Sequence, residues 1–223
     1  MSETRYQEFV FRDGRFIGDF ENMYKQASEV PWHQDVLAHH FYVDLDILIL
    51  KEMRRRFAFR TVADVAAGLG HVTDRIHREV LMGQIGAEPG EISGFELSST
   101  AVNQASKLFP HLNFSCLNVL EELPKALVES FDLVTVKDCL WYVLGDLPTF
   151  WKNLCRMSRR FVFVSQTFPS DPVFVGQDVY PNAASLLEDA VNRGFKVIHA
   201  ICEQDSAHGD RESAHLFLEK PTS

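Results

Sequence analysis

The feature that most constrains the fold is an alternation of short apolar runs with amphipathic stretches, which starts near residue 61 and continues to the end of the chain. Short apolar runs predict strands, and apolar residues at steps near 3.6 predict helices. The predicted strands lie at 61–65, 92–97, 114–117, 131–136 and 160–165, and the predicted helices at 71–82, 98–108, 147–157 and 183–193. Such alternation is typical of an α/β protein in which helices cover both faces of a parallel sheet.

The end of the chain departs from this alternation. Residues 195–202 and 213–220 both have the pattern of strands, and only the polar segment EQDSAHGDRES connects them. A parallel partner would need a crossover connection, usually a helix, which this segment does not provide. We therefore predict a Rossmann-like, doubly wound sheet of seven mostly parallel strands, with an antiparallel last strand.

Residues 1–34 precede this pattern and are rich in aromatic side chains. A short helix is expected from Asp19 to Ser28, before Pro31. From Asp35 onward we expect one long amphipathic helix, which buries Leu37, Phe41, Leu45, Leu48 and Met53. The chain is therefore expected to consist of an N-terminal segment, 1–34, that covers a binding site, and a main domain, 35–223.

The composition excludes several classes of function. The formal charge of −9 argues against binding to nucleic acid, because proteins that do so contact phosphates through clusters of Lys and Arg. The four cysteines form no CxxC pair, which suits reduced thiols in a cytoplasmic protein. No apolar run is long enough to span a membrane. We expect a small-molecule partner and a monomer or homodimer.

The most specific local pattern is VADVAAGLGHVTDRI, 62–76, where a predicted strand enters a glycine-rich bend. It is no Walker loop, because His-Val follows Gly70 instead of Lys and Ser or Thr. It matches the dinucleotide pattern G-x-G-x-x-G poorly, because Thr73 stands at the third glycine. The next predicted strand ends in Glu96, whose carboxylate can accept two hydrogen bonds from a ribose diol.

With these motifs the chain resembles the class I S-adenosylmethionine-dependent methyltransferases. Their first motif, hydrophobic-x-D-x-G-x-G-x-G, stands here as Val62–Gly70, and Glu96 matches the acidic residue of their second motif. The segments CLNVLEELP, 116–124, and FDLVTVKDCLWYV, 131–143, resemble their third and fourth regions. The antiparallel last strand is also that family's topology. Ala66 replaces the first glycine, which we expect to be tolerated only if its φ is negative.

The resemblance implies S-adenosylmethionine as cofactor, S-adenosylhomocysteine as product, and a role for each matching residue. Asp64 would orient the methionine ammonium, and Glu96, with Leu97 beside it, would bind the ribose hydroxyls. The remaining implied cofactor residues are Ala66, Gly68 and Gly70 along the methionyl and ribose portion, and Asn118 and Val119 at the adenine. Simpler roles stay open: Asp64 can cap a helix, Glu96 can be a solvated carboxylate, and Asn118 can form a turn.

The reacting groups are expected at the carboxyl ends of the fourth and fifth strands and on the N-terminal segment. Asp138 is the first candidate for contacting the cofactor ammonium or the acceptor, and it can also be a simple turn residue. His33 is the candidate general base. Further candidates are Trp141, Tyr142, Gln166 and Thr167 near the strands, and Tyr24 and Trp32 on the segment. The candidate metal ligands are Asp205, His208, Asp210 and His215 of the last hairpin. They would form a metal site only if they converged, and we expect no metal.

The leading interpretation is a methyltransferase that acts on a hydroxyl or an amine of a small polar metabolite, such as a sugar or a sugar nucleotide. Lys-Asp-Cys-Leu follows the fourth strand, instead of the Asn/Asp-Pro-Pro-aromatic run of the members that methylate adenine. Two alternatives remain. One is an NAD(P)-dependent oxidoreductase, which shares the sheet and the ribose carboxylate, and the other is a protein that binds the cofactor without turnover.

Overall fold

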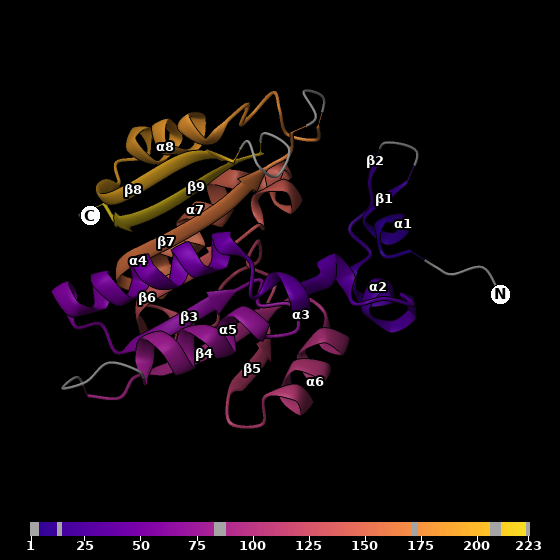
Figure 1. Cartoon of the computed structure of the whole chain (residues 1–223), viewed down its shortest axis with the longest axis horizontal. Helices are drawn as coiled ribbons and strands as arrows, with labels where there is room; N and C mark the ends of the chain where they lie inside the picture. Colours follow the sequence, from indigo (N-terminus) through magenta and orange to yellow (C-terminus); the bar gives the residue numbers. More distant parts are fainter. Residues whose placement is uncertain (1–4, 13–14, 83–87, 171–173, 206–210, 222–223) are drawn as a thin grey trace. The chain divides into compact units, whose positions relative to one another are not determined.

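A computed structural model describes residues 5–12, 15–82, 88–170, 174–205 and 211–221 (Figure 1). Its strands form a mixed sheet of seven in the order β5-β4-β3-β6-β7-β9-β8, with helices on both sides. The strands are β3 (Thr61–Val65), β4 (Glu91–Glu96), β5 (Asn113–Cys116), β6 (Phe131–Lys137), β7 (Ser158–Phe168), β8 (Lys196–Asp205) and β9 (Arg211–Glu219). The pairs β4–β5 and β6–β7 are parallel, whereas β9 is antiparallel to both β7 and β8. The predicted α/β fold with an antiparallel last strand is confirmed.

The chain divides into two compact units. The first consists of Met1–Arg60 and Asp64–Asn118, and the second of Thr61–Ala63 and Val119–Ser223. The first unit contains a small hairpin, β1 (Phe11–Arg12) and β2 (Arg15–Phe16), and the helices α1 (Gln7–Val10), α2 (Phe20–Gln26), α3 (Gln34–Leu37), α4 (Phe41–Phe57), α5 (His71–Arg75) and α6 (Ser99–Leu108). A 3₁₀ turn, Pro31–His33, precedes α3, and a π-helical stretch, Ile76–Leu81, extends α5. Residues 1–34 lie within this unit, and their role as a cover stays a prediction.

The long helix expected from Asp35 is interrupted. It is divided into α3 and α4, and the extended residue His40 caps α4 by accepting a hydrogen bond from the Tyr42 N–H. Of the predicted inward residues, Met53 is buried as expected, whereas Phe41 is 53% and Leu48 63% exposed. The helix has a second apolar stripe, and this one is buried: Tyr42, Val43, Ile47, Ile49, Leu50 and Met53. Periodicity reveals such stripes, but it does not say which of two packs inward.

The prediction for the helix that begins after Ser98 is wrong at one residue of its buried face. Ser98 caps α6 as expected, and Ala101 and Ala105 are wholly buried. Leu108, predicted to face inward, is exposed in the last turn of the helix. Among the described residues, no helix combines the length and the apolar character that crossing a membrane requires.

The second unit contains β6 to β9 with α7 (Leu147–Met157) and α8 (Ala183–Asn192). The bounds of α7 agree with the prediction, because Asp146 caps its N-terminus and proline stands in its first turn. Gly194 follows α8 with a φ of 85°, the left-handed conformation that ends many helices. Val162 and Val164 of β7 pair with Leu218 and Leu216 of β9, and all four are buried.

Candidate functional site

The glycine-rich bend after β3 has an unusual backbone. Ala66, Gly68 and Gly70 have φ values of 60°, 56° and 83°. The expectation that Ala66 keeps a negative φ is therefore wrong, and a side chain in this region costs about 1–2 kcal/mol. Hydrogen bonds hold the bend: the Ala67 N–H donates to the Phe95 carbonyl (3.0 Å) and the Gly70 N–H to the Ala67 carbonyl (2.9 Å).

The two glycines of the bend serve different purposes. A Cβ on Gly70 would lie 2.5 Å from Cζ of Phe114, so this glycine is required by packing against β5. A Cβ on Gly68 would instead overlap the side-chain amide of Gln34. Gly68 therefore leaves room for a polar group next to the backbone, as a ligand site requires.

Glu96 is buried at the end of β4 and accepts three backbone hydrogen bonds. Its Oε2 accepts from the Gly68 N–H (2.9 Å), and its Oε1 accepts from the N–H groups of Leu97 (2.8 Å) and Ser98 (3.2 Å). Burial raises the pKa of the Glu96 carboxyl, and the three N–H donors oppose that shift. Glu96 is therefore no solvated edge carboxylate. An ionised carboxylate has about four acceptor positions, so after these three bonds about one position remains for a ribose hydroxyl.

Asp64 is also buried, and it contacts the helix that follows the bend. Its Oδ2 accepts a 2.5 Å hydrogen bond from the Thr73 hydroxyl. The N-cap of α5 is Gly70, with no side-chain cap, so Asp64 does not cap this helix. Thr73, which weakened the match to the dinucleotide pattern, is therefore the residue that fixes the Asp64 carboxylate.

Gln34 connects the N-terminal segment to the bend, and the sequence analysis did not select it. Its Oε1 accepts from the Leu69 N–H (2.8 Å), and its Nε2 donates to the Tyr24 hydroxyl (2.9 Å). Tyr24, a predicted site residue, thus reaches the bend through Gln34. The other two predicted residues of the segment have local contacts. Trp32 lies 5.4 Å from the Tyr6 ring, and His33 is exposed with its Nε2 4.0 Å from Glu29.

Glu21 on α2 connects the same segment to the first turn of α6. Its carboxylate accepts from the hydroxyls of Ser98 (2.7 Å), Thr100 (2.7 Å) and Ser99 (3.0 Å). The bonds from Ser98 and Thr100, with that of Lys25, hold the pKa of the Glu21 carboxyl well below its usual range. Glu21 was also missed, because no local pattern points from residue 21 to residue 98.

The predicted adenine-binding residues and Leu97 lie just beyond the ends of β5 and β4. Leu97 is exposed next to Glu96, and Asn118 is half-buried. The Val119 carbonyl accepts from Nδ2 of Asn153 (2.8 Å), which fixes the backbone there. Their roles toward the cofactor stay predictions.

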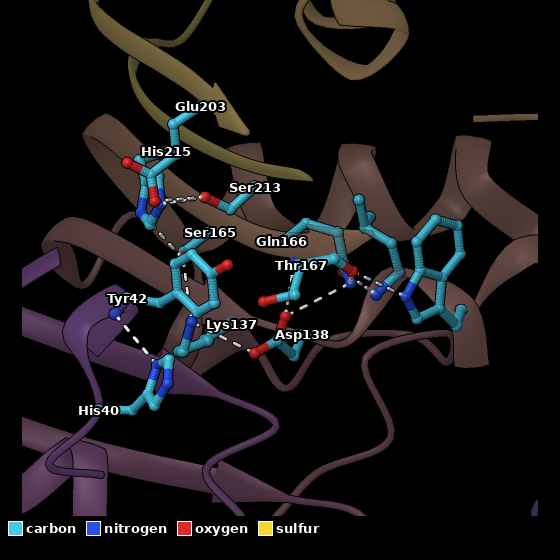
Figure 2. A network of polar contacts seen from close by, with 12 residues as sticks. His40, Tyr42, Lys137, Asp138, Ser165, Gln166, Thr167, Glu203, Ser213 and His215 are labelled. Carbon is cyan, nitrogen blue, oxygen red and sulfur yellow. Dashed lines mark hydrogen bonds and ion pairs between the residues drawn. The ribbon is translucent and has the colours of Figure 1, made fainter. Parts of the chain in front are cut away.

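In the second unit, three of the predicted residues, Asp138, Gln166 and Thr167, come together (Figure 2). The Asp138 Oδ1 accepts from the Thr167 N–H (2.7 Å) and lies 3.5 Å from Nε2 of Gln166, and its Oδ2 lies 3.2 Å from Nζ of Lys137. The φ of Asp138 is 49°, a left-handed conformation that side chains rarely adopt. The carboxylate is nevertheless 42% exposed, so it is fixed by its neighbours and open to solvent.

Hydrogen bonds of the Trp141 and Gln166 side chains hold the loop after β6 against β7. The Gln166 Oε1 accepts from the Leu140 N–H (3.0 Å), and Nε1 of Trp141 donates to the Thr167 carbonyl (3.2 Å). The Trp141 ring meets the Phe168 ring at 5.3 Å in an edge-to-face arrangement. Trp141 and Tyr142 are both half-buried, as residues that form the wall of a site would be.

The described residues contain no cluster of His, Cys, Asp and Glu that could hold a metal. Of the hairpin residues considered for such a site, His208 and Asp210 lie outside the described residues. His215 is fully buried in β9, where its ring nitrogens contact the hydroxyls of Ser213 (2.8 Å) and Ser165 (3.4 Å). The described cysteines are free thiols.

No family model and no curated protein matches this sequence. Solved structures do match. The N-methyltransferase NodS from Bradyrhizobium japonicum WM9, in complex with S-adenosylhomocysteine, has a TM-score of 0.63 at 12% identity, over 91% of this chain and 98% of that one. Magnesium protoporphyrin IX methyltransferase from Synechocystis PCC 6803, with bound S-adenosylmethionine, has a TM-score of 0.57 at 14% identity, over 96% and 89%.

A protein with a different activity is also similar. The [4+2]-cyclase SpnF has a TM-score of 0.58 at 16% identity, over 79% of this chain and 81% of that one. At such identities the similarity establishes the architecture, and the chemistry depends on the residues described above.

Proposed function

We propose that this chain, which has the fold of the class I S-adenosylmethionine-dependent methyltransferases, transfers a methyl group from S-adenosylmethionine to a hydroxyl or an amine of a small polar metabolite. The observation that carries the proposal is the buried carboxylate of Glu96, which accepts from the N–H of Gly68, a position where the glycine leaves space for a polar group. A sugar or a sugar nucleotide is the acceptor class that we favour.

The residues of the first unit fit an adenosyl sulfonium. Glu96 retains about one acceptor position for a ribose hydroxyl, and Asp64 would offer a fixed carboxylate to the methionine ammonium. Gln34 contacts the bend through a neutral amide, so its side chain brings no charge there that would repel an anionic or cationic ligand. Asn118 would contact the adenine, together with Val119, the next residue in the chain, which belongs to the second unit.

The cofactor supplies an already activated methyl group, so the protein has to align the acceptor and remove its proton. Asp138 suits the second task. Its carboxylate is held in place by contacts with Lys137 and with the Thr167 N–H, and it is exposed enough to meet an acceptor. Trp141 offers a half-buried aromatic ring, which supports a sugar as acceptor because aromatic rings pack well against sugar faces. The free thiols support a cytoplasmic location.

Calorimetry with S-adenosylhomocysteine tests the cofactor site. We expect wild type to bind, and Glu96→Ala to raise the dissociation constant about 10- to 100-fold, because the ribose loses a hydrogen bond to a charged group. Glu91→Ala is the matched control: this exposed carboxylate lies at the other end of the same strand, and affinity should not change. Equal affinity of Glu96→Ala and wild type, or binding of NAD instead, would refute the site.

Turnover is tested separately. A metabolite extract is incubated with the protein and a donor that carries a deuterated methyl group, and labelled products are identified by mass spectrometry. A labelled small polar product supports the proposal and identifies the acceptor. Binding without labelled product, across a broad panel of extracts, would instead indicate a protein that holds the cofactor without chemistry.

A further inference from the structure

A line of polar side chains crosses the strands of the second unit, starting beside Asp138 (Figure 2). The line is formed by one side chain from β6, one from β7, two from β9 and one from β8. Its contacts are Lys137 Nζ to Ser165 Oγ (3.1 Å), Ser165 Oγ to His215 Nδ1 (3.4 Å), His215 Nε2 to Ser213 Oγ (2.8 Å) and Ser213 Oγ to Glu203 Oε1 (3.2 Å). The line therefore connects the Asp138–Lys137 ion pair with β8, the edge strand of the sheet.

The register of the strands produces this line. Ser165 on β7 pairs with His215 on β9, and Ser213 on β9 pairs with Glu203 on β8. Ser165, Ser213 and His215 are at most 1% exposed. Their neighbours Val164 and Leu216 are apolar, and apolar side chains would pack here without the cost of burying polar groups. A buried polar row in such surroundings calls for a functional explanation.

The two ends of the line determine the direction of every hydrogen bond. A Lys ammonium can only donate, so Ser165 accepts from Lys137. An ionised carboxylate can only accept, so Ser213 donates its proton to Glu203 and accepts from Nε2–H of His215. The Nδ1 lone pair of a neutral His215 then accepts from Ser165. Each donor thus points away from Lys137 and toward Glu203.

We propose that Lys137, Ser165, His215, Ser213 and Glu203 form a proton path that carries the acceptor's proton from Asp138 to Glu203. The proposal rests on the proposed function, because methylation of an O–H or N–H group releases that proton. The path is a property of this chain's sheet, and Glu203, half-exposed on β8, is its exit to solvent.

The transfers balance along the chain. When the acceptor forms its new bond to the methyl carbon, the methyl–sulfur bond breaks, and Asp138 takes the acceptor's proton. Lys137 passes one proton to Ser165, Ser165 passes its own to Nδ1 of His215, and Nε2–H passes through Ser213 to Glu203. Asp138 then returns its proton to the neutral Lys137 amine. The ion pair is restored, Glu203 is protonated, and His215 is left as the Nδ1–H tautomer until the path resets.

The tautomer of His215 tests the direction of the path without any turnover. Nitrogen NMR of the ligand-free protein distinguishes Nε2–H from Nδ1–H and from the doubly protonated ring. The signals are assigned among the nine histidines by difference from His215→Gln. We expect Nε2–H. The Nδ1–H form or the doubly protonated ring would overturn the proposal, because the bonds would then no longer all point toward Glu203.

The second test is made in turnover, at low and high concentrations of a small buffer. His215→Gln retains a donor and an acceptor but cannot relay a proton, and Ser213→Ala removes a hydroxyl that Ser213→Thr retains. In the first two variants we expect kcat to fall at least tenfold, to recover as buffer concentration rises, and S-adenosylhomocysteine affinity to stay unchanged. Ser213→Thr and His199→Gln, a histidine of β8 outside the path, should behave as wild type.

The outcomes separate the two proposals. If kcat falls in His215→Gln and Ser213→Ala and buffer does not restore it, the two residues have only a structural role, and the proton path is overturned. Unchanged kcat in His215→Gln and Ser213→Ala would also overturn the proton path, but it would leave the proposed methyltransferase function intact. If wild type methylates no acceptor, the proposed function fails, and the path fails with it even where His215 has the expected tautomer.

Discussion

The bend after β3 and the polar network around Asp138 differ in the groups that form their hydrogen bonds. In the bend, side chains of Glu96 and Gln34 accept hydrogen bonds from backbone N–H groups, among them those of Gly68 and Leu69. Around Asp138 the line continues from side chain to side chain across neighbouring strands. The first region depends on backbone dihedral angles, and the second depends on the chemistry of individual side chains.

This difference indicates what each region is suited to do. A backbone of fixed shape can hold a ligand in place but has no group that gains or loses a proton near neutral pH. A row of Lys, His, Asp and Glu can move protons but contributes little shape. We therefore expect substitutions in the first region to change stability and binding, and substitutions in the second to change the rate.

The largest effect is expected for Asp138→Asn. Asparagine tolerates the left-handed conformation of residue 138, so the loop should keep its shape while the base is lost. We expect kcat to fall about 10²- to 10⁴-fold, the usual contribution of a general base, with unchanged affinity for S-adenosylhomocysteine. Asp146→Asn is the control, because asparagine also caps a helix well. A loss of affinity without a loss of kcat would assign Asp138 to the binding region instead.

Gly70→Ala tests the first region through stability. The φ of 83° disfavours any side chain, and the new methyl would meet the Phe114 ring at 2.5 Å. Together these effects should lower the free energy of unfolding by about 2–4 kcal/mol in denaturant titrations. Gly145→Ala has open space around its Cβ and should change it by less than about 0.5 kcal/mol. Equal stability of the two variants would show that the bend is not held by its dihedral angles.

Glu21→Ala should loosen the N-terminal segment without unfolding the domain. The variant removes a carboxylate, about one-third exposed, that accepts hydrogen bonds from the hydroxyls of Ser98 and Thr100. We therefore expect a modest loss of about 1 kcal/mol in local opening. Hydrogen exchange of the α2 amides should accelerate about fivefold. Glu8→Ala, on the exposed side of α1, should leave that exchange unchanged. Acceleration in both variants would mean that the segment is held by something other than Glu21.

The sequence was sufficient for the sheet and for most helices, since strands and caps leave local signals. Asp146 and the proline after it define α7, and the missing crossover predicted the antiparallel β9. It was not sufficient for α4, where two apolar stripes compete. It was wrong about Ala66, because the hydrogen bonds of the bend, formed with residues far along the chain, outweigh the intrinsic preference of alanine.

The residues of the candidate site also fall into those that the sequence could predict and those that it could not. Glu96, Gly68 and Asp138 stand directly after strands, where sequence position alone predicts a role. Gln34 and Glu21 reach their partners through tertiary structure, which no local pattern reveals. The proton path is a stronger case, because Ser165 and His215 are 50 positions apart and only the register of β7 against β9 aligns them. Polar residues at alternate positions of a buried strand, Ser213 and His215, were the available signal.

The smallest effect concerns His77, a residue of the π-helical stretch that extends α5 beyond the bend. Burial, and then the charge of His111, lower the pKa of His77, and among the described residues its buried Nδ1 has no hydrogen-bond partner. A lowered pKa means that the unfolded chain binds the proton more readily, so this contribution to stability is present above about pH 6.5 and is lost as pH falls through the folded pKa. His77→Phe should reduce that loss by less than about 1 kcal/mol in unfolding titrations between pH 7.5 and 5.5, because the ring is only partly buried. His199→Gln should retain the wild-type slope. Identical slopes in wild type and His77→Phe would mean that His77 adds no proton-linked term to this region.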